Sequence, residues 1–224
     1  MQIINRILLI AVLTLNAILP GCSQPSKDAD IQKLWLDTGL KGEMPYELFR
    51  NAILGYRQID VLRKKNIITV IDYSKPSTEN RFYVIDLEKK KLLYKCLVAH
   101  GKNTGENIAE NFSNKAESLK SSLGFFLTAE TYIGDNGYSL KLDGLEKGIN
   151  DSARIREIVI HGADYVSQKF IDENGRLGRS WGCPALPVEF SKDIIDKISE
   201  GSCLYIWADN LYYKKNSTFN KLPK

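Results

Sequence analysis

The feature that most constrains the fold is a succession of short apolar runs rich in β-branched and aromatic residues. Runs of this kind, bounded by turn residues, are typical of β-strands. The strands that we expect are 66–73, 81–86, 92–99, 123–132, 138–142, 157–161 and 203–208. Four charged residues, 88–91, separate two of these runs and predict a hairpin. Because few helical segments interrupt the series, the sequence predicts a mostly-β sandwich or barrel with a few helices.

Three segments have the character of helices. Residues 44–62 carry apolar side chains at helical spacing, so we expect an amphipathic N-terminal helix packed across one face of the sheet. A second helix is expected over 188–198, before Gly201, and a short one within 163–174. Residues 101–122, by contrast, are polar and weakly patterned, and a loop of that length in a compact domain is more often functional than idle.

The composition is typical of a globular chain and does not indicate a strongly charged partner. Hydrophobic residues make up 43% of the 224 residues, and 31 basic and 27 acidic residues leave a formal charge of +4. The two signs are interspersed, whereas nucleic-acid-binding domains usually carry a basic stripe, so we expect no nucleic-acid partner. The composition leaves the oligomeric state open.

The first residues have the pattern of an export signal. Arg6 precedes an apolar run over 7–19, which is too short to span a bilayer comfortably. The run ends in Leu-Pro-Gly-Cys22, which resembles the lipobox of bacterial lipoproteins. We therefore expect a signal peptide over 1–21, lipidation of Cys22, and a protein anchored to a membrane outside the cytoplasm (periplasmic). Ordinary cleavage that leaves Cys22 as a spare thiol is the alternative.

The segment 177–186, Leu-Gly-Arg-Ser-Trp-Gly-Cys-Pro-Ala-Leu, carries the strongest chemical signal. Gly182 allows a substrate to approach closely, and Pro184 favours an extended backbone at Cys183. A thiol on such a turn suits a nucleophile, because the N–H groups beside it can stabilise the oxyanion formed on attack.

A thiol nucleophile needs a base, because a free cysteine with a pKa near 8.5 is mostly protonated at neutral pH. The chain has two histidines, His100 and His161. His161 ends a β-branched run and precedes Gly162, whose carbonyl is a hydrogen-bond partner available to the imidazole. We therefore expect Cys183 and His161 to form the catalytic pair.

These motifs together resemble the catalytic domain of the L,D-transpeptidase (YkuD-like) family, and specifically its murein L,D-transpeptidase lipoprotein branch. The central motif is Ile-His161-Gly162 followed by Ser180-Trp181-Gly182-Cys183. The wider likeness runs from about residue 67 to residue 208 and includes the segments 98–101, 112–114, 121–124 and 179–185.

The resemblance implies a role for each matching residue. Cys183 is the nucleophile, and His161 is the base, oriented by the backbone carbonyl of Gly162. Backbone N–H groups around Gly182 and Cys183 form the oxyanion hole, to which Ser180 also belongs. Contacts with the substrate are expected from His100, Ser122, Gly124, Arg179 and Trp181. Purely structural roles are the alternative for His100 and Ser122.

The resemblance also implies a reaction. Such an enzyme acts on peptidoglycan stem tetrapeptides: the thiol attacks the carbonyl of the third, diamino-acid residue and expels the terminal D-Ala. An amine of a second stem then gives a 3–3 cross-link, whereas water gives L,D-carboxypeptidase activity. No metal or cofactor is implied. The expected divisions are a signal peptide 1–21, a lipidated tether 22–43, a catalytic domain 44–212 and a polar tail 213–224.

Other readings of the same residues stay open. His100, His161 and Cys183 could ligate zinc as a metallopeptidase, although no close ligand pair such as His-x-x-x-His occurs. The chain could be a wall-binding lipoprotein without activity, or an amidase that cleaves another wall bond with the same pair. Cys96 and Cys203 are expected to be buried thiols, with a disulfide between them as the alternative.

Overall fold

The structure, a computed structural model, describes residues 27–219. Its elements along the chain are α1 (Lys27–Asp37), α2 (Tyr46–Tyr56), β1 (Ile67–Asp72), β2 (Phe82–Asp86), β3 (Lys91–Cys96), β4 (Gly124–Gly134), β5 (Gly137–Gly144), β6 (Val159–Gly162), α3 (Gln168–Asn174), β7 (Ala185–Leu186), α4 (Val188–Ile198), β8 (Cys203–Trp207) and α5 (Leu211–Asn216). The expected strands, the hairpin of β2 and β3, and the helix over 188–198 are all present.

The strands form one eight-stranded sheet in the order β3-β2-β1-β8-β4-β5-β6-β7. Most neighbours are antiparallel, but β1 pairs with β8, and β6 with β7, in parallel. The chain that leaves β3 then crosses to the other edge of the sheet, where Ala99 bridges Ala185 of β7 and Gly101 bridges Ser180. The sheet is therefore a nearly closed barrel, which confirms the prediction of a mostly-β fold.

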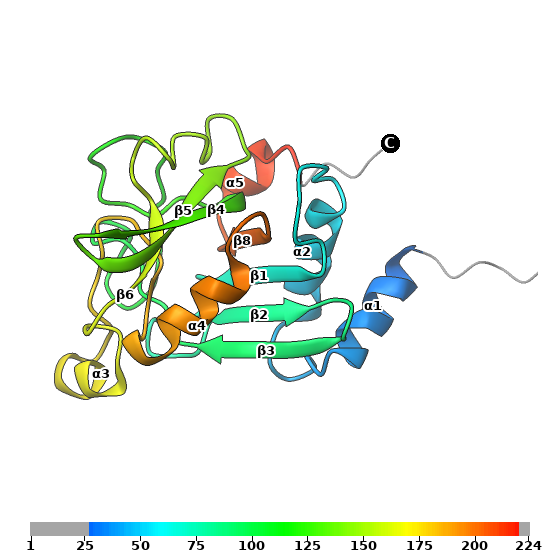
Figure 1. Cartoon of the computed structure of the whole chain (residues 1–224), viewed down its shortest axis with the longest axis horizontal. Helices are drawn as coiled ribbons and strands as arrows, with labels where there is room; N and C mark the ends of the chain where they lie inside the picture. Colours follow the sequence, from blue (N-terminus) through cyan, green and yellow to red (C-terminus); the bar gives the residue numbers. More distant parts are fainter. Residues whose placement is uncertain (1–26, 220–224) are drawn as a thin grey trace, which may run out of the picture.

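The core of the barrel is apolar and continuous. Every residue of β1 and β2 is buried, as expected for strands covered on both faces. Helix α4 crosses the front of the sheet in Figure 1 and buries Ile194, Ile195 and Ile198. Cys96 and Cys203 lie in the same core as free thiols, so the disulfide alternative is not realised.

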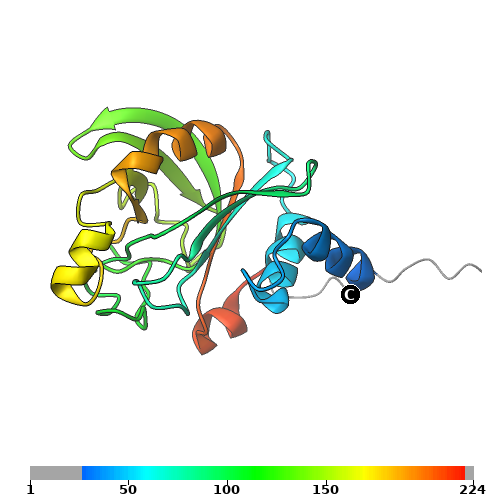
Figure 2. The ribbon, with the colours of Figure 1, turned by 90° about the horizontal axis from the view of Figure 1, so that it is seen from below.

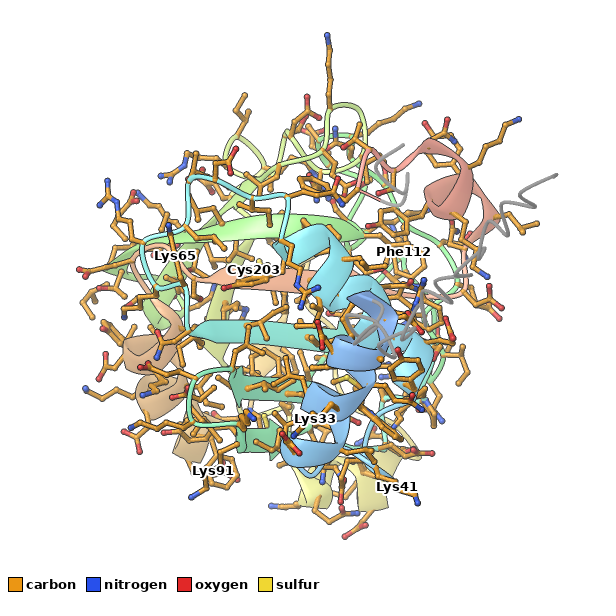
Figure 3. The ribbon with its side chains drawn as sticks, turned by 90° about the vertical axis from the view of Figure 1, so that its right-hand side faces the viewer. Lys33, Lys41, Lys65, Lys91, Phe112 and Cys203 are labelled. Carbon is orange, nitrogen blue, oxygen red and sulfur yellow. The ribbon has the colours of Figure 1, made fainter. Side chains whose placement is uncertain are left out.

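Helices α1 and α2 lie at the end of the molecule away from β6 and α3 (Figures 1 and 2). Figure 3 looks onto this end, with α1 and α2 in front of the strands. The expected helix 44–62 is the shorter α2, which ends at Tyr56 and buries Leu48 and Phe49. No helix among residues 27–219 is long and apolar enough to cross a membrane.

The boundaries of the folded domain differ from the expected ones at both ends. The signal peptide 1–21 and Cys22 lie outside the described residues. Residues 27–43, expected as part of a tether, include α1 and the fully buried Ile31 and Leu40, because their apolar side chains pack on the core. At the other end, the expected tail begins inside α5, where the Tyr213 hydroxyl donates to the carboxylate of Glu146 at 3.1 Å.

Candidate active site

The parallel pairing of β6 and β7 brings the two expected catalytic residues together. His161 on β6 is in register with Ala185 on β7, and Cys183 lies two residues before Ala185. Cys183 is therefore level with Val159, whose backbone N–H donates to the Cys183 Sγ at 3.4 Å. The pairing depends on two segments separated by α3, and it places the sulfur beside the strand that carries the histidine.

Cys183 and His161 line one cavity of about 450 Å³. Tyr165, on the connection after β6, and the loop before β7 form part of its wall. The remaining lining residues are Asp135, Asn136, Arg156, Glu157, Ile158, Arg179, Ser180 and Trp181. The cavity joins the tip of the β4–β5 hairpin to the cysteine loop, so a molecule bound there would touch both.

The thiol of Cys183 is held in its neutral form. Its side chain is 9% exposed, and the S–H points to the backbone carbonyl of Glu157 at 3.6 Å. Burial raises the pKa of Cys183, while the Val159 N–H and the Arg156 guanidinium act in the opposite direction. Among the hydrogen bonds of residues 27–219, none joins this sulfur to His161. Resting geometry of this kind is common before a substrate binds.

The imidazole of His161 is prepared to accept a proton. Its Nδ1 lies 3.0 Å from the carbonyl oxygen of Gly162. Because a carbonyl only accepts, Nδ1 carries the hydrogen and Nε2 keeps its lone pair. Burial lowers the pKa of His161, so the ring is neutral at pH 7.

The turn around Gly182 differs in part from the expected oxyanion hole, because two of its expected donors are already used. The Gly182 N–H donates to the Ser180 hydroxyl at 3.1 Å, and that hydroxyl donates to the Cys183 carbonyl at 2.6 Å. The Ser180 N–H donates to the carbonyl of His100. Gly182 and Ser180 thus use their donors to shape the turn. The Cys183 N–H, in contrast, has no partner among the hydrogen bonds of the described residues.

His100 does not line the cavity. It is 1% exposed, its Nδ1 accepts from Arg81 Nη2 at 2.8 Å, and its Nε2 contacts the carbonyl of Gly105 at 3.2 Å. Burial, with the neighbouring Arg81 charge, lowers the pKa of His100 to about 4. The structure therefore places His100 in a buried polar cluster, which fits the structural alternative.

Two other expected substrate contacts also lie outside the cavity. The Ser122 hydroxyl is buried, donates to the Ser113 carbonyl at 2.8 Å and accepts from Arg156 Nη1 at 2.6 Å. Gly124 begins β4 at φ 104°, and a Cβ there would lie 2.3 Å from the Glu146 carboxylate. Packing against a buried carboxylate explains this glycine without a substrate.

Arg179 and Trp181 do line the cavity. The Arg179 Nη1 is 2.6 Å from the Glu106 carboxylate, so part of its guanidinium is already paired. The Trp181 side chain is 79% exposed, which makes it a wall of the mouth and not part of the core.

The sequence did not single out Arg156, Glu157, Tyr165 or the hairpin tip Asp135-Asn136. Arg156 is tied to the loop 113–122: its Nη1 donates to the carbonyl of Ser113 at 2.7 Å, and its Nη2 to the carbonyl of Lys120 at 2.6 Å. The Gly-Asp-Asn-Gly turn predicts the hairpin itself. Its approach to Cys183 is a long-range contact that no local pattern signals.

The zinc alternative lacks a ligand set. Within the described part of the chain, no group of three His, Cys, Asp or Glu side chains is placed to hold a metal ion. Both ring nitrogens of His100 already have hydrogen-bond partners. His100 also does not line the cavity that contains His161 and Cys183.

Comparison with solved structures gives matches at low identity. An L,D-transpeptidase from Mycobacterium smegmatis is similar at 14% identity and a TM-score of 0.39, over 64% of this chain and 59% of that one. The helical cell shape determining protein Pgp2 from Campylobacter jejuni is similar at 14% identity and a TM-score of 0.42, over 64% and 47%. A fused Zn-dependent amidase/peptidase/peptidoglycan-binding domain-containing protein from Clostridium acetobutylicum is similar at 15% identity and a TM-score of 0.40, over 82% and 64%. The matches span less than two thirds of each of these chains.

No curated protein matches the chain. The family model described as the L,D-transpeptidase catalytic domain, however, matches residues 40–207. This range contains the whole barrel, the cavity, and both Cys183 and His161. The chain therefore belongs to the L,D-transpeptidase catalytic domain family.

Proposed function

We propose that the chain is a cysteine-dependent L,D-transpeptidase that acts on tetrapeptide stems of peptidoglycan, with Cys183 as nucleophile and His161 as base. One observation carries the proposal: the two side chains line one cavity, and the Gly162 carbonyl fixes the imidazole so that Nε2 is free to accept. The family match supports the same chemistry.

The first half-reaction forms a thioester. The Cys183 side chain turns from the Glu157 carbonyl towards the cavity and gives its proton to His161 Nε2. The sulfur then attacks the carbonyl carbon of the third stem residue. As the C–N bond to the terminal D-Ala breaks, the leaving amine takes the proton back from His161, which ends neutral.

The oxyanion formed in this step needs donors that are not already used. The Cys183 N–H meets that condition, since the N–H groups of Gly182 and Ser180 are bound within the turn. We assign the Cys183 N–H as an oxyanion donor, with Gly182 and Ser180 as the residues that aim it.

The second half-reaction consumes the thioester. Transfer to the amine of a second stem gives a 3–3 cross-link, and transfer to water gives L,D-carboxypeptidase activity. Trp181 and Arg179 are the side chains at the mouth that we assign to the substrate. Arg179 is suited to a stem carboxylate, since a guanidinium can bind a carboxylate with two hydrogen bonds.

The proposed location is the outer side of a membrane. The apolar run before Cys22 and its Leu-Pro-Gly-Cys motif favour lipidation, which would hold the domain next to the wall. Expression of a Cys22→Ala variant tests this: the protein should leave the membrane fraction and lose the mass of its acyl chains.

Mass spectrometry of purified muropeptides tests the activity. Incubation with the wild-type domain should give dimers that lack one D-Ala, tripeptides, or both, and Cys183→Ala should give neither. Product formation by Cys183→Ala would contradict the assignment of the nucleophile. An amidase would be recognised by cleavage at a bond other than the one before the terminal D-Ala.

A further inference from the structure

A buried serine hydroxyl joins the cysteine turn to two other segments of the chain. Ser121, near the end of the loop 113–122, is 1% exposed, and its Oγ donates to the carbonyl of Gly182 at 3.0 Å. The same Oγ accepts from the backbone N–H of Gly101 at 3.0 Å. A serine hydroxyl has a single hydrogen, and Ser121 therefore uses it on the residue that precedes Cys183.

We infer that Ser121 is a positioning residue that fixes the direction of the Cys183 N–H, to which the role of oxyanion donor is assigned above. The inference rests on the proposed function and adds to it a residue that is far from Cys183 in the sequence. Ser121 is not among the residues that line the catalytic cavity. It therefore acts through the peptide group that joins Gly182 to Cys183, and not by contact with a substrate.

The peptide bond between Gly182 and Cys183 transmits the contact. It is trans and close to planar, so its C=O and its N–H point in opposite directions. The hydroxyl that holds the Gly182 oxygen on one side thereby turns the Cys183 N–H to the other side, away from Ser121. This N–H has no hydrogen-bond partner within residues 27–219, so the contact with Ser121 holds the peptide group by its carbonyl end.

The chain on either side of this peptide group differs in stiffness. Gly182 has no Cβ and tolerates a wide range of backbone angles, including its own φ of 132°. On the other side, the Ser180 hydroxyl donates to the Cys183 carbonyl at 2.6 Å, and Pro184 limits the backbone of Cys183. The contact from Ser121 thus supplies the restraint that a glycine lacks.

Ser121 is itself held in place on several sides. Its backbone N–H donates to Thr104 Oγ1 at 2.8 Å, and its carbonyl accepts from the Ser113 N–H at 3.0 Å. A Cβ on Gly101 would lie 2.9 Å from the Gly182 Cα and 3.0 Å from the Ser121 nitrogen, so the three segments pack without room for another side chain. Hydrogen bonds and close packing of this kind are what a positioning residue needs.

Two reagents separate the direction of the Cys183 N–H from the reactivity of the thiol. The sulfur attacks the carbonyl carbon of p-nitrophenyl acetate, the C–O bond breaks, and the products are acetylated Cys183, p-nitrophenolate and the thiol proton. Negative charge develops on the carbonyl oxygen during this attack. Iodoacetamide instead reacts at its methylene carbon and loses iodide, without an oxyanion. The ratio of the acetylation rate to the alkylation rate, both mapped to Cys183 by peptide mass spectrometry, therefore reports oxyanion stabilisation.

We expect Ser121→Ala to lower this ratio by about 30-fold, because removal of a whole oxyanion donor costs about 100-fold or more and a misdirected donor costs less. Ser121→Cys fills the same space with a weaker donor and should lower the ratio by about tenfold. Ser202→Ala is the matched control: its buried hydroxyl donates to the Ile198 carbonyl at 2.6 Å, outside the cavity, and the ratio should stay that of the wild type.

A ratio equal to that of the wild type in the Ser121 variants would overturn the inference, whether both rates stay the same or change together. Ser121→Cys decides the result if Ser121→Ala does not fold. With a purified disaccharide tetrapeptide, kcat of the Ser121 variants should fall and KM should stay unchanged, because the oxyanion forms only after binding. A change confined to KM would also overturn it.

The proposed function can fail separately. If the wild type is acetylated but makes neither tripeptide nor cross-linked dimer from the tetrapeptide, the proposed function is wrong, and the ratio of the two rates still decides the role of Ser121. If product forms and the ratio is the same in every variant, the role of Ser121 is wrong and the function stands. If Cys183 of the wild type is not acetylated at all, both are wrong.

Discussion

The Nδ1 atom of His161 lies 3.0 Å from the carbonyl oxygen of Gly162, the next residue along the chain. This contact fixes both the tautomer and the orientation of the ring, so that a proton can be accepted only at Nε2. The base and its orienting group thus come from one strand end, and no third side chain is required for the arrangement.

The first prediction concerns the pH dependence of the pair. Burial raises the pKa of Cys183 and lowers that of His161, so both groups are neutral at pH 7. The rate of alkylation by iodoacetamide should therefore keep rising with pH beyond the ordinary pKa of a cysteine, about 8.5. A rate that is already at its plateau at pH 6 would indicate a thiolate–imidazolium pair and contradict this reading.

The loss of activity at low pH follows from the direction in which the pKa of His161 is shifted. His161 must be neutral to act as a base, and its pKa lies below the ordinary value of 6.5. The value of kcat/KM on the tetrapeptide should thus hold from pH 7 to 6.5 and fall only at lower pH. A midpoint above 6.5 would mean that the imidazole is stabilised as a cation.

The second prediction concerns the turn at Gly182. Its φ is 132°, and a Cβ there would lie 2.9 Å from both the Ile158 Cδ1 and the backbone oxygen of Lys120. Gly182→Ala must displace the cysteine loop, and we expect kcat/KM to fall by about 100-fold. Gly148→Ala is the matched control, since Gly148 also has a positive φ, of 77°, but nothing lies within 4 Å of its Cβ position. Equal activities in the two variants would refute the steric argument.

The third prediction concerns Arg156. Its charge lowers the pKa of Cys183, and its guanidinium ties the loop 113–122 to the cavity through four hydrogen bonds. Arg156→Gln should slow alkylation of Cys183 at pH 8 by about fivefold, the effect of about 1 kcal/mol of charge interaction. Arg57→Gln, at the end of α2, removes an equal charge far from the site and should leave the rate unchanged.

The fourth prediction concerns stability and the buried His100. Its pKa is about 4 in the folded protein against 6.5 for the free side chain, so the unfolded chain binds the proton first as the pH falls. The contribution to stability is complete above pH 6.5 and is lost between pH 6.5 and 4, by up to about 3 kcal/mol.

His100→Gln provides the comparison. A glutamine can accept from Arg81 and donate to the Gly105 carbonyl, as the histidine does, but it does not titrate. Urea unfolding at pH 7 and pH 4 should show a smaller loss of unfolding free energy in the variant than in the wild type. Identical losses of unfolding free energy in the two proteins would show that the titrating group is not His100.

The sequence predicted most of the strands because their β-branched runs are locally distinct. It also predicted Cys183 and His161 as partners, since two rare side chains sit beside glycines at a strand end and a turn. The tether was expected over 22–43 because Ser23 to Asp30 is polar, yet Ile31 and Leu40 are buried. Their packing on the core depends on residues far along the chain.

The site residues were harder to predict where a glycine or histidine serves packing. Gly124 lies against the Glu146 carboxylate, and His100 against Arg81, and neither contact has a signature in the sequence. The same holds for Glu157, whose backbone has a left-handed φ of 56° and whose carbonyl accepts from the Cys183 thiol. Only three-dimensional pairing shows which N–H groups remain free beside Cys183.

The most direct test of the central claim is to trap the thioester. The protein is mixed with a purified tetrapeptide muropeptide, quenched in acid and mapped by peptide mass spectrometry. The account predicts that the peptide containing Cys183 gains the mass of the stem without its terminal D-Ala, and that His161→Gln strongly reduces this adduct. Release of D-Ala while Cys183 stays unmodified, and at an equal rate in Cys183→Ala, would contradict it.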